Sequence, residues 1–188
     1  MQASASTRVH PHAWAPALIV LALGVAGCRA DAGGQQMRMS QHGTVSQTIG
    51  RTQVTIEYNR PVARGRKLFG PDAVVSYGRV WNPGADQATT VEFSTDVQVD
   101  GHQLAAGKYS LWVVPGPDEW TVVFSRAADV FHTPYPGREH DALRITVTPE
   151  GGDHMETLAF YFPVVDGRKA VLRLHWGETI VPISIQAP

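Results

Sequence analysis

The sequence predicts an all-β fold: a single antiparallel β-sandwich or jelly-roll-like domain of about nine strands. Apolar and polar residues alternate with a period of two along much of the chain, as in strands with one buried and one exposed face. The 18 glycines and 13 prolines are spread along the chain, as expected when many short strands are joined by turns. No segment carries apolar residues at helical spacing over three turns.

The expected strands follow from these alternations in chain order. Val54, Ile56 and Tyr58 alternate with polar residues and fall on one face of the first clear strand. Asp166-Gly167 predicts a hairpin turn, because both residues tolerate positive φ. Three segments are apolar on both faces, which predicts central strands at 109–114, 120–124 and 158–165. The other expected strands cover residues 89–93, 97–99, 143–148, 172–176 and 181–185.

Residues 1–27 predict a lipoprotein signal peptide. Arg8 precedes an apolar stretch at 13–26, which is too short to span a bilayer and is typical of the core of a secretory signal. Val25-Ala26-Gly27-Cys28 resembles a bacterial lipobox, which predicts that Cys28 is acylated, for example with palmitate, and becomes the new N-terminus. The alternative is an ordinary signal peptide with a chance cysteine.

An acylated Cys28 predicts a membrane partner and a cell-envelope location. Two or more acyl chains anchor a protein stably. Arg29 after the cysteine favours the outer membrane, with the domain facing the periplasm or the exterior. Residues 28–43 show no periodicity and are expected to form a flexible tether, followed by the β-sandwich domain at 44–188. Cys28 is the single cysteine, which excludes disulfides, cysteine nucleophiles and thiolate metal sites from the domain.

Composition and charge exclude further classes of protein. With 43% hydrophobic and 18% charged residues, the chain is neither intrinsically disordered nor a coiled coil. The formal net charge of −1 gives no general electrostatic attraction to nucleic acid. We therefore expect no nucleic-acid partner.

An ordered set of short motifs resembles one bacterial family. The set includes Val45-Ser46-Gln47-Thr48-Ile49-Gly50, Arg60-Pro61, Gly65-Arg66-Lys67, Phe69-Gly70, Tyr77-Gly78, Val80-Trp81, Gly84-Ala85, Ala88-Thr89-Thr90, Ala106-Gly107, Tyr109-Ser110-Leu111 and Glu119-Trp120-Thr121-Val122. In this order the motifs resemble the domain-of-unknown-function 2911 family. The resemblance implies an exported, often lipid-anchored bacterial domain, and it brings no established activity. Where the family commonly has arginine and asparagine, this chain has Asn82 and Asp86, which shifts that loop from basic toward acidic.

Two long stretches without alternation, 60–86 and 126–141, are the expected location of a ligand site. Long irregular connections inside compact domains are disproportionately functional. The first stretch opens with the bases Arg60, Arg64, Arg66 and Lys67, and arginine matches carboxylate or phosphate oxygens bidentately. The alternative is a solvated loop, or structural salt bridges to Glu57, Asp72 or Asp86.

The candidate ligand-binding residues are therefore Arg60, Arg66, Trp81 and Asp86, lining one cleft. Trp81 lies where it could stack on a sugar ring, whereas Trp120 and Trp176 are in phase with apolar strand faces and are expected in the core. No metal and no cofactor is expected, because the spacing of the possible ligands matches no recognised site. Those possible ligands are His132, His140, Asp141 and His154.

The leading interpretation is a lipid-anchored envelope protein that acts as a non-catalytic binding or structural module, with a small molecule or a glycan as ligand. The alternative is a hydrolase acting on a glycan or another envelope component, using carboxylates near 60–86 with Asp86 as the first acid to mutate. A third possibility is an accessory subunit of an envelope complex, which would expose an apolar patch. The sequence leaves the catalytic residues, protein partners and oligomeric state open.

Overall fold

The computed structural model describes residue 2 and residues 39–188. The predicted signal peptide, the acylated Cys28 and most of the predicted tether lie outside these residues. Within the described part of the chain, no helix is long and apolar enough to cross a membrane. The first strand begins at Gln41, just before residue 44, where the domain was expected to start.

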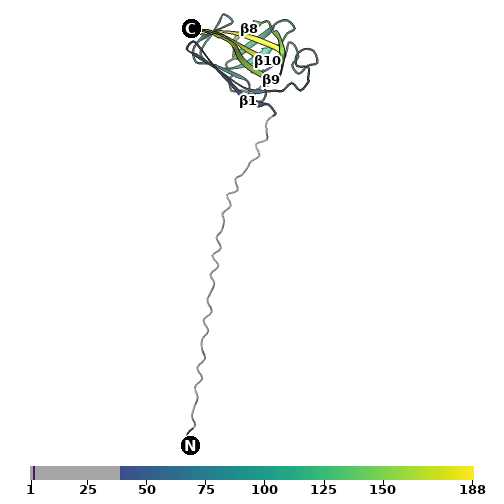
Figure 1. Ribbon diagram of the computed structural model, residues 1–188, viewed down its shortest axis with the longest axis vertical. Coiled ribbons are helices and arrows are strands. Elements are labelled where there is room, and N and C mark those ends of the chain that lie inside the picture. The colour runs from purple at the N-terminus through teal and green to yellow at the C-terminus, as the bar shows by residue number, and fades with distance from the viewer. Residues whose placement is uncertain (1, 3–38) are drawn as a thin grey trace. The chain divides into compact units, whose positions relative to one another are not determined.

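Ten antiparallel strands form two sheets (Figure 1), and the prediction of an all-β sandwich is confirmed. A single 3-10 turn, η1 (Arg138–His140), is the one other regular element in residues 39–188. The six-stranded sheet has the spatial order β1 (Gln41–Ile49), β2 (Thr52–Arg60), β3 (Thr90–Phe93), β6 (Gly107–Val114), β7 (Trp120–Ser125) and β8 (Asp141–Val147). The four-stranded sheet has the order β5 (His102–Leu104), β4 (Val97–Val99), β10 (Lys169–Gln186) and β9 (Glu150–Asp166).

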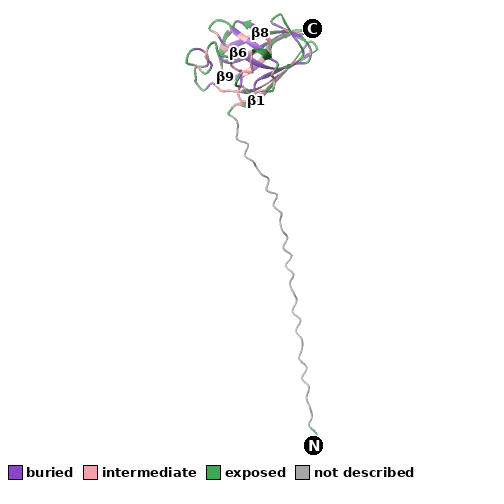
Figure 2. Cartoon of the chain, turned by 180° about the vertical axis from the view of Figure 1, so that it is seen from behind, coloured by how far each residue is buried: buried purple, intermediate pink, exposed green. Residues whose placement is uncertain are grey.

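The main core lies between the two sheets and follows the alternation of the sequence. Val54 and Ile56 on β2 are fully buried, while the residues between and beside them are more exposed. Trp120 and Trp176 are each buried in this core, as predicted. Buried residues gather along the strands and exposed residues at the turns and loops (Figure 2).

A second, smaller apolar cluster lies on the outer face of the six-stranded sheet. Trp112 on β6 and Val123 on β7 point away from the main core and are buried together with Ala88. The loop 126–141 covers them, with Val130 and Tyr135 packed against the cluster. β6 and β7 are therefore buried on both faces, which confirms that they are central strands.

The prediction that 158–165 forms a central strand is wrong, because β9 lies at the edge of the four-stranded sheet. Its apolar run combines two environments. Leu158 and Phe160 face the core, whereas Val164 and Val165 are 54% and 41% exposed near the β9–β10 turn. An apolar run on both faces can therefore belong to a strand whose end leaves the core, and not only to a strand that is buried throughout.

β10 reverses direction within its length. An extended strand of 18 residues would span about 60 Å. However, the amide of Ala187, just after β10, donates a hydrogen bond of 2.8 Å to the carbonyl of Arg168, just before it. The two ends of β10 therefore lie side by side, and Gly177, with φ of 61°, lies midway between them. This explains why the sequence shows two alternating segments, 172–176 and 181–185, where the structure has one element.

Candidate functional site

The segment 60–86, called the cap below, closes one end of the main core. Phe69 packs edge-on against Trp81, Trp120 and Trp176, with ring centroids 5.8, 4.8 and 6.0 Å apart. Trp81 stacks on Trp176 at 5.7 Å with an interplanar angle of 18°. Its backbone amide and carbonyl also pair with Val113 on β6, at 2.8 Å each. Trp81 is therefore held inside an aromatic cluster that joins the cap to both sheets.

Arg66 and Arg60 donate hydrogen bonds to backbone carbonyls of the protein itself. The Arg66 guanidinium donates through Nε to the carbonyl of Ala63 at 2.9 Å and through NH2 to that of Val62 at 2.6 Å. Arg60 Nε donates to the carbonyl of Leu158 on β9 at 3.1 Å. These bonds hold the cap in its turn and fix it to β9.

Asp86 lies where the cap meets the loop 126–141. Its backbone is left-handed, with φ of 59°, and its carbonyl accepts a hydrogen bond of 2.9 Å from the amide of His132. The His132 ring nitrogen Nδ1 lies 2.8 Å from the same carbonyl oxygen. The two irregular segments thus lie side by side, as expected for a shared site. The four candidate residues have different neighbours: Arg60 meets β9, Arg66 the cap backbone, Trp81 the aromatic cluster and Asp86 the loop.

Asn82 is a structural residue of the cap that the sequence did not single out as such. Its side chain is completely buried. Its Nδ2 donates to the carbonyl of Leu111 at 2.7 Å, and its Oδ1 accepts from the amide of Thr89 at 3.0 Å. The side chain thus joins the cap to β6 and to the residues just before β3.

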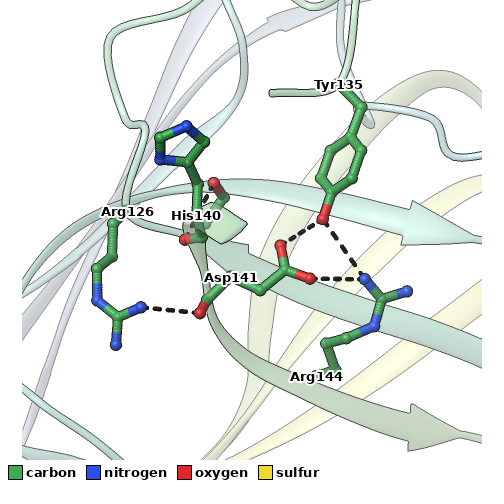
Figure 3. Close-up of polar contacts among 6 residues, drawn as sticks. Arg126, Tyr135, His140, Asp141 and Arg144 are labelled. Atoms are coloured by element: carbon green, nitrogen blue, oxygen red, sulfur yellow. Dashed lines mark hydrogen bonds and ion pairs between the residues drawn. The ribbon is translucent and has the colours of Figure 1, made fainter. Parts of the chain in front are cut away.

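Polar contacts among Arg126, Tyr135, Asp141 and Arg144 fix the loop 126–141 over the second apolar cluster (Figure 3). The Tyr135 hydroxyl donates to one carboxylate oxygen of Asp141, and Arg144 NH1 lies 2.7 Å from the other. Arg126 NH1 donates to the Asp141 backbone carbonyl at 2.8 Å. The Tyr135 ring also packs edge-on against Trp112, with centroids 5.3 Å apart.

The environment of Tyr135 keeps its phenol neutral. Burial, followed by the hydrogen bond to Asp141 and its charge, raises the pKa of Tyr135 to about 12. At neutral pH the phenol is protonated and donates its hydrogen bond to Asp141. The cluster explains how the loop is held in place.

The histidines are dispersed. In residues 2 and 39–188, no group of three or more His, Cys, Asp or Glu side chains is placed to hold a metal ion. His154 Nε2 lies 2.9 Å from Glu156 at the surface. His175, which the sequence did not single out, is buried with Nδ1 3.2 Å from the Tyr161 hydroxyl and Nε2 3.0 Å from the Asp153 carbonyl. Because a carbonyl only accepts hydrogen bonds, Nε2 carries the proton and the Tyr161 hydroxyl donates to Nδ1.

A groove of about 420 Å³ lies on the outer face of the four-stranded sheet. It is called the groove below. Val99, Ala170 and Ile185 turn inward to the core, so the residues next to them on β4 and β10 turn outward. Its apolar lining residues are Val164, Ala170, Val171 and Ile185. Its polar lining consists of Gln98, Asp100, Asp166, Lys169, Ser184 and Gln186.

The groove and the cap lie at opposite ends of the domain. β1 pairs with β2 so that Gln41 faces Arg60 at the cap and Ile49 faces Thr52 at the other end. The amide of Gly50, beyond that second end, donates to the carbonyl of Gly167 at 2.9 Å. Gly167 belongs to the β9–β10 turn beside the groove. Eight residue steps along β1 correspond to about 26 Å between the two ends.

Sequence reasoning missed the groove, although part of its signal is visible. Asp100-Gly101 and Asp166-Gly167 are both hairpin-turn pairs, but a hairpin was predicted only at the second. In the structure Asp100, Gly101 and Gly167 all have positive φ. The alternating segments 172–176 and 181–185 do not show by themselves that the two arms of β10 bring these turns to one face.

The family of the chain follows from residues 40–185, which match a family described as protein of unknown function (DUF2911). The chain belongs to the DUF2911 family. The match covers the two sheets, the cap and the groove almost completely. No curated protein and no solved structure matches the chain.

Proposed function

We propose that this DUF2911 protein is a lipid-anchored, non-catalytic binding module of the bacterial cell envelope, and that its ligand occupies the groove. The observation that carries the proposal is the groove itself: about 420 Å³ of hollow on a sheet face, with both charged and apolar groups around it. Its volume falls in the range of small-ligand sites, where apolar side chains and polar groups together line a hollow.

The cap supports the same assignment. Arg66 and Trp81, two of the side chains that suggested an anion or sugar site, are engaged in hydrogen bonds and ring contacts inside the protein. Binding a ligand there would break the contacts that close the core. The groove residues Asp100, Ser184 and Lys169 are exposed and can meet a ligand without such a loss.

The proposed anchor would leave the groove accessible. Gln41, the first residue of β1, lies at the cap end next to Arg60, and the groove lies at the other end. A chain held to a membrane through Cys28 would therefore be attached at the end away from the groove. The lipobox-like Val25-Ala26-Gly27-Cys28 supports this attachment.

The anchor is tested by growing cells with an alkyne analogue of palmitate and isolating the protein. We expect the parent protein to carry the label and to be recovered in the membrane fraction. A Cys28→Ser variant should show neither the label nor the membrane association. Equal labelling of the two proteins contradicts acylation at Cys28.

The groove is tested by NMR titration of the 15N-labelled chain with sugars, amino acids and peptides of the envelope. We expect amide shifts at Gln98, Ser184 and Gln186, and loss of binding in a Ser184→Arg variant that fills the groove. An Arg66→Ala variant is the matched control and should bind as the parent does. Shifts confined to the cap, or a chemically altered probe after incubation, contradict the proposal and favour the hydrolase alternative at Asp86.

A further inference from the structure

We infer that the groove binds a short, extended peptide that carries a lysine or arginine beside an aliphatic residue. This inference rests on the proposed function and names its ligand class. Three features of the groove lead to it: the arrangement of charges, the span between its two walls, and the chemistry of the surface between them.

The charges of the groove favour a cationic ligand. Asp100 comes from the β4–β5 turn, and Asp166 and Lys169 come from the β9–β10 hairpin. Asp166 and Lys169 are directly opposite each other in the β9–β10 register, so their charges partly offset each other. Asp100 has no base among the groove residues on its own wall. The groove therefore has a net negative charge with its excess at the β4 wall.

The span between the walls fits an extended chain of a few residues. β4 pairs with the C-terminal arm of β10 at Ile185 and Gln186, and β9 pairs with the N-terminal arm at Lys169 and Ala170. The two arms lie side by side, as the Ala187-to-Arg168 hydrogen bond shows. Three strand spacings therefore separate β4 from β9, about 14 Å. An extended peptide advances about 3.3 Å per residue, so roughly four residues cross the groove.

The surface between the walls offers what a peptide backbone needs. Gln98 and Gln186 are neighbours across β4 and β10, and Ser184 lies on the same outer face. Their amides and hydroxyl both donate and accept hydrogen bonds, as backbone N–H and C=O groups require. Val164 and Val171 provide an aliphatic surface for a side chain. The described groove lining contains no aromatic ring, so the flat platform on which sugar rings stack is missing.

The experiment is an isothermal titration calorimetry measurement on the full chain in low salt. It uses three probes, of which the two peptides have capped termini. The first is a tetrapeptide with one lysine next to a valine, the second has glutamate in place of the lysine, and the third is a neutral N-acetylated disaccharide. We expect the lysine peptide to bind at least tenfold more tightly than the glutamate peptide. Its affinity should fall as salt is raised.

Two variants locate the binding. Asp100→Asn should weaken the lysine peptide at least fivefold, because it removes the excess carboxylate and keeps the side-chain volume. Asp118→Asn, on the β6–β7 turn away from the groove, is the matched control and should leave the affinity unchanged. Circular dichroism confirms that both variants keep the sheet signal.

The outcomes separate the inference from the proposed function. Equal binding of the lysine and glutamate peptides, or an unchanged affinity in Asp100→Asn, overturns the inference. Binding of the disaccharide alone, with NMR shifts at Gln98 and Gln186, overturns the peptide class and leaves the groove as the site. If no probe binds and no ligand in the wider titration shifts groove amides, both fail.

Discussion

The cap and the groove lie at opposite ends of one sandwich. In each of them the role in the structure differs from the role that the sequence suggests. The cap holds most features that suggest a ligand site: clustered arginines, an irregular backbone and a tryptophan. In the structure those features close the core through Phe69 and Trp81 and hold the segment in its turn. The groove end consists of ordinary turn and strand residues. The comparison teaches that conspicuous chemistry in a loop is often used internally, while a hollow can form where plain hairpins meet.

The variant with the largest expected effect on stability tests whether the cap is part of the core. Phe69→Ala removes a ring that contacts Trp81, Trp120 and Trp176, and should lower the free energy of unfolding by about 3 kcal/mol. Chemical denaturation followed by tryptophan fluorescence measures it. Phe131→Ala is the control, because Phe131 is 48% exposed and should cost under about 1 kcal/mol. Equal losses in the two variants would mean that the cap does not close the core.

A smaller effect tests the contact between the cap and the middle of β10. Gly177 has φ of 61°, and a Cβ there would lie 2.6 Å from Leu68 Cδ1 on the cap. Gly65 has φ of 66° and no heavy atom within 4 Å of such a Cβ. Gly65→Ala should cost about 1 kcal/mol from backbone strain alone. Gly177→Ala should cost about 2 kcal/mol, because the Leu68 side chain must also move.

Urea unfolding of the two glycine variants checks this pair. The difference between them isolates the packing of the cap on β10. A Gly65→Ala variant less stable than Gly177→Ala contradicts the assigned contact.

The smallest expected effect on stability comes from the loop 126–141, and it depends on pH. The pKa of Tyr135 is raised to about 12 from 10, so the folded state favours the protonated phenol. Its contribution to stability is present in full below pH 10 and is lost as pH rises from 10 to 12. Tyr135→Phe should cost about 1 kcal/mol at pH 8 by loss of the hydrogen bond to Asp141. The variant should also lose less stability than the parent between pH 10 and 12.

Unfolding midpoints at pH 8 and at the highest pH where the fold persists measure this dependence. Tyr77→Phe is the control, because Tyr77 is exposed on the cap, and it should follow the parent at every pH. Identical pH slopes in the parent and in Tyr135→Phe contradict the assigned role of the phenol.

Much of the fold was predictable because period-two alternation is a local property of the chain. Trp120 and Trp176 are core residues for the reason the sequence gives: each is in phase with its apolar neighbours. The position of β9 at the sheet edge was not predictable, because Val164 and Val165 look the same in sequence whether they are buried or exposed. Strand order depends on pairing between distant segments, which a local pattern does not record.

The candidate site was predictable only in its parts. Asp86 and His132 do bring the two irregular segments together, as expected from their shared lack of alternation. The destination of the Arg66 guanidinium could not be deduced, because the carbonyls of Val62 and Ala63 accept its bonds only in one turn geometry. Whether Asp86, Arg60, Arg66 and Trp81 also meet a ligand stays a prediction, which the Arg66→Ala variant tests for Arg66.

The reversal of β10 also determines when the domain can fold. The arm that ends at Gln186 lies between β4 and the rest of its sheet, so segments far apart in the sequence meet in the middle of that sheet. β4 and β5 can therefore join the sheet only once this arm of β10 is in place. Contacts between such distant segments make folding slow. We therefore expect closure of the four-stranded sheet to limit the rate at which the domain folds.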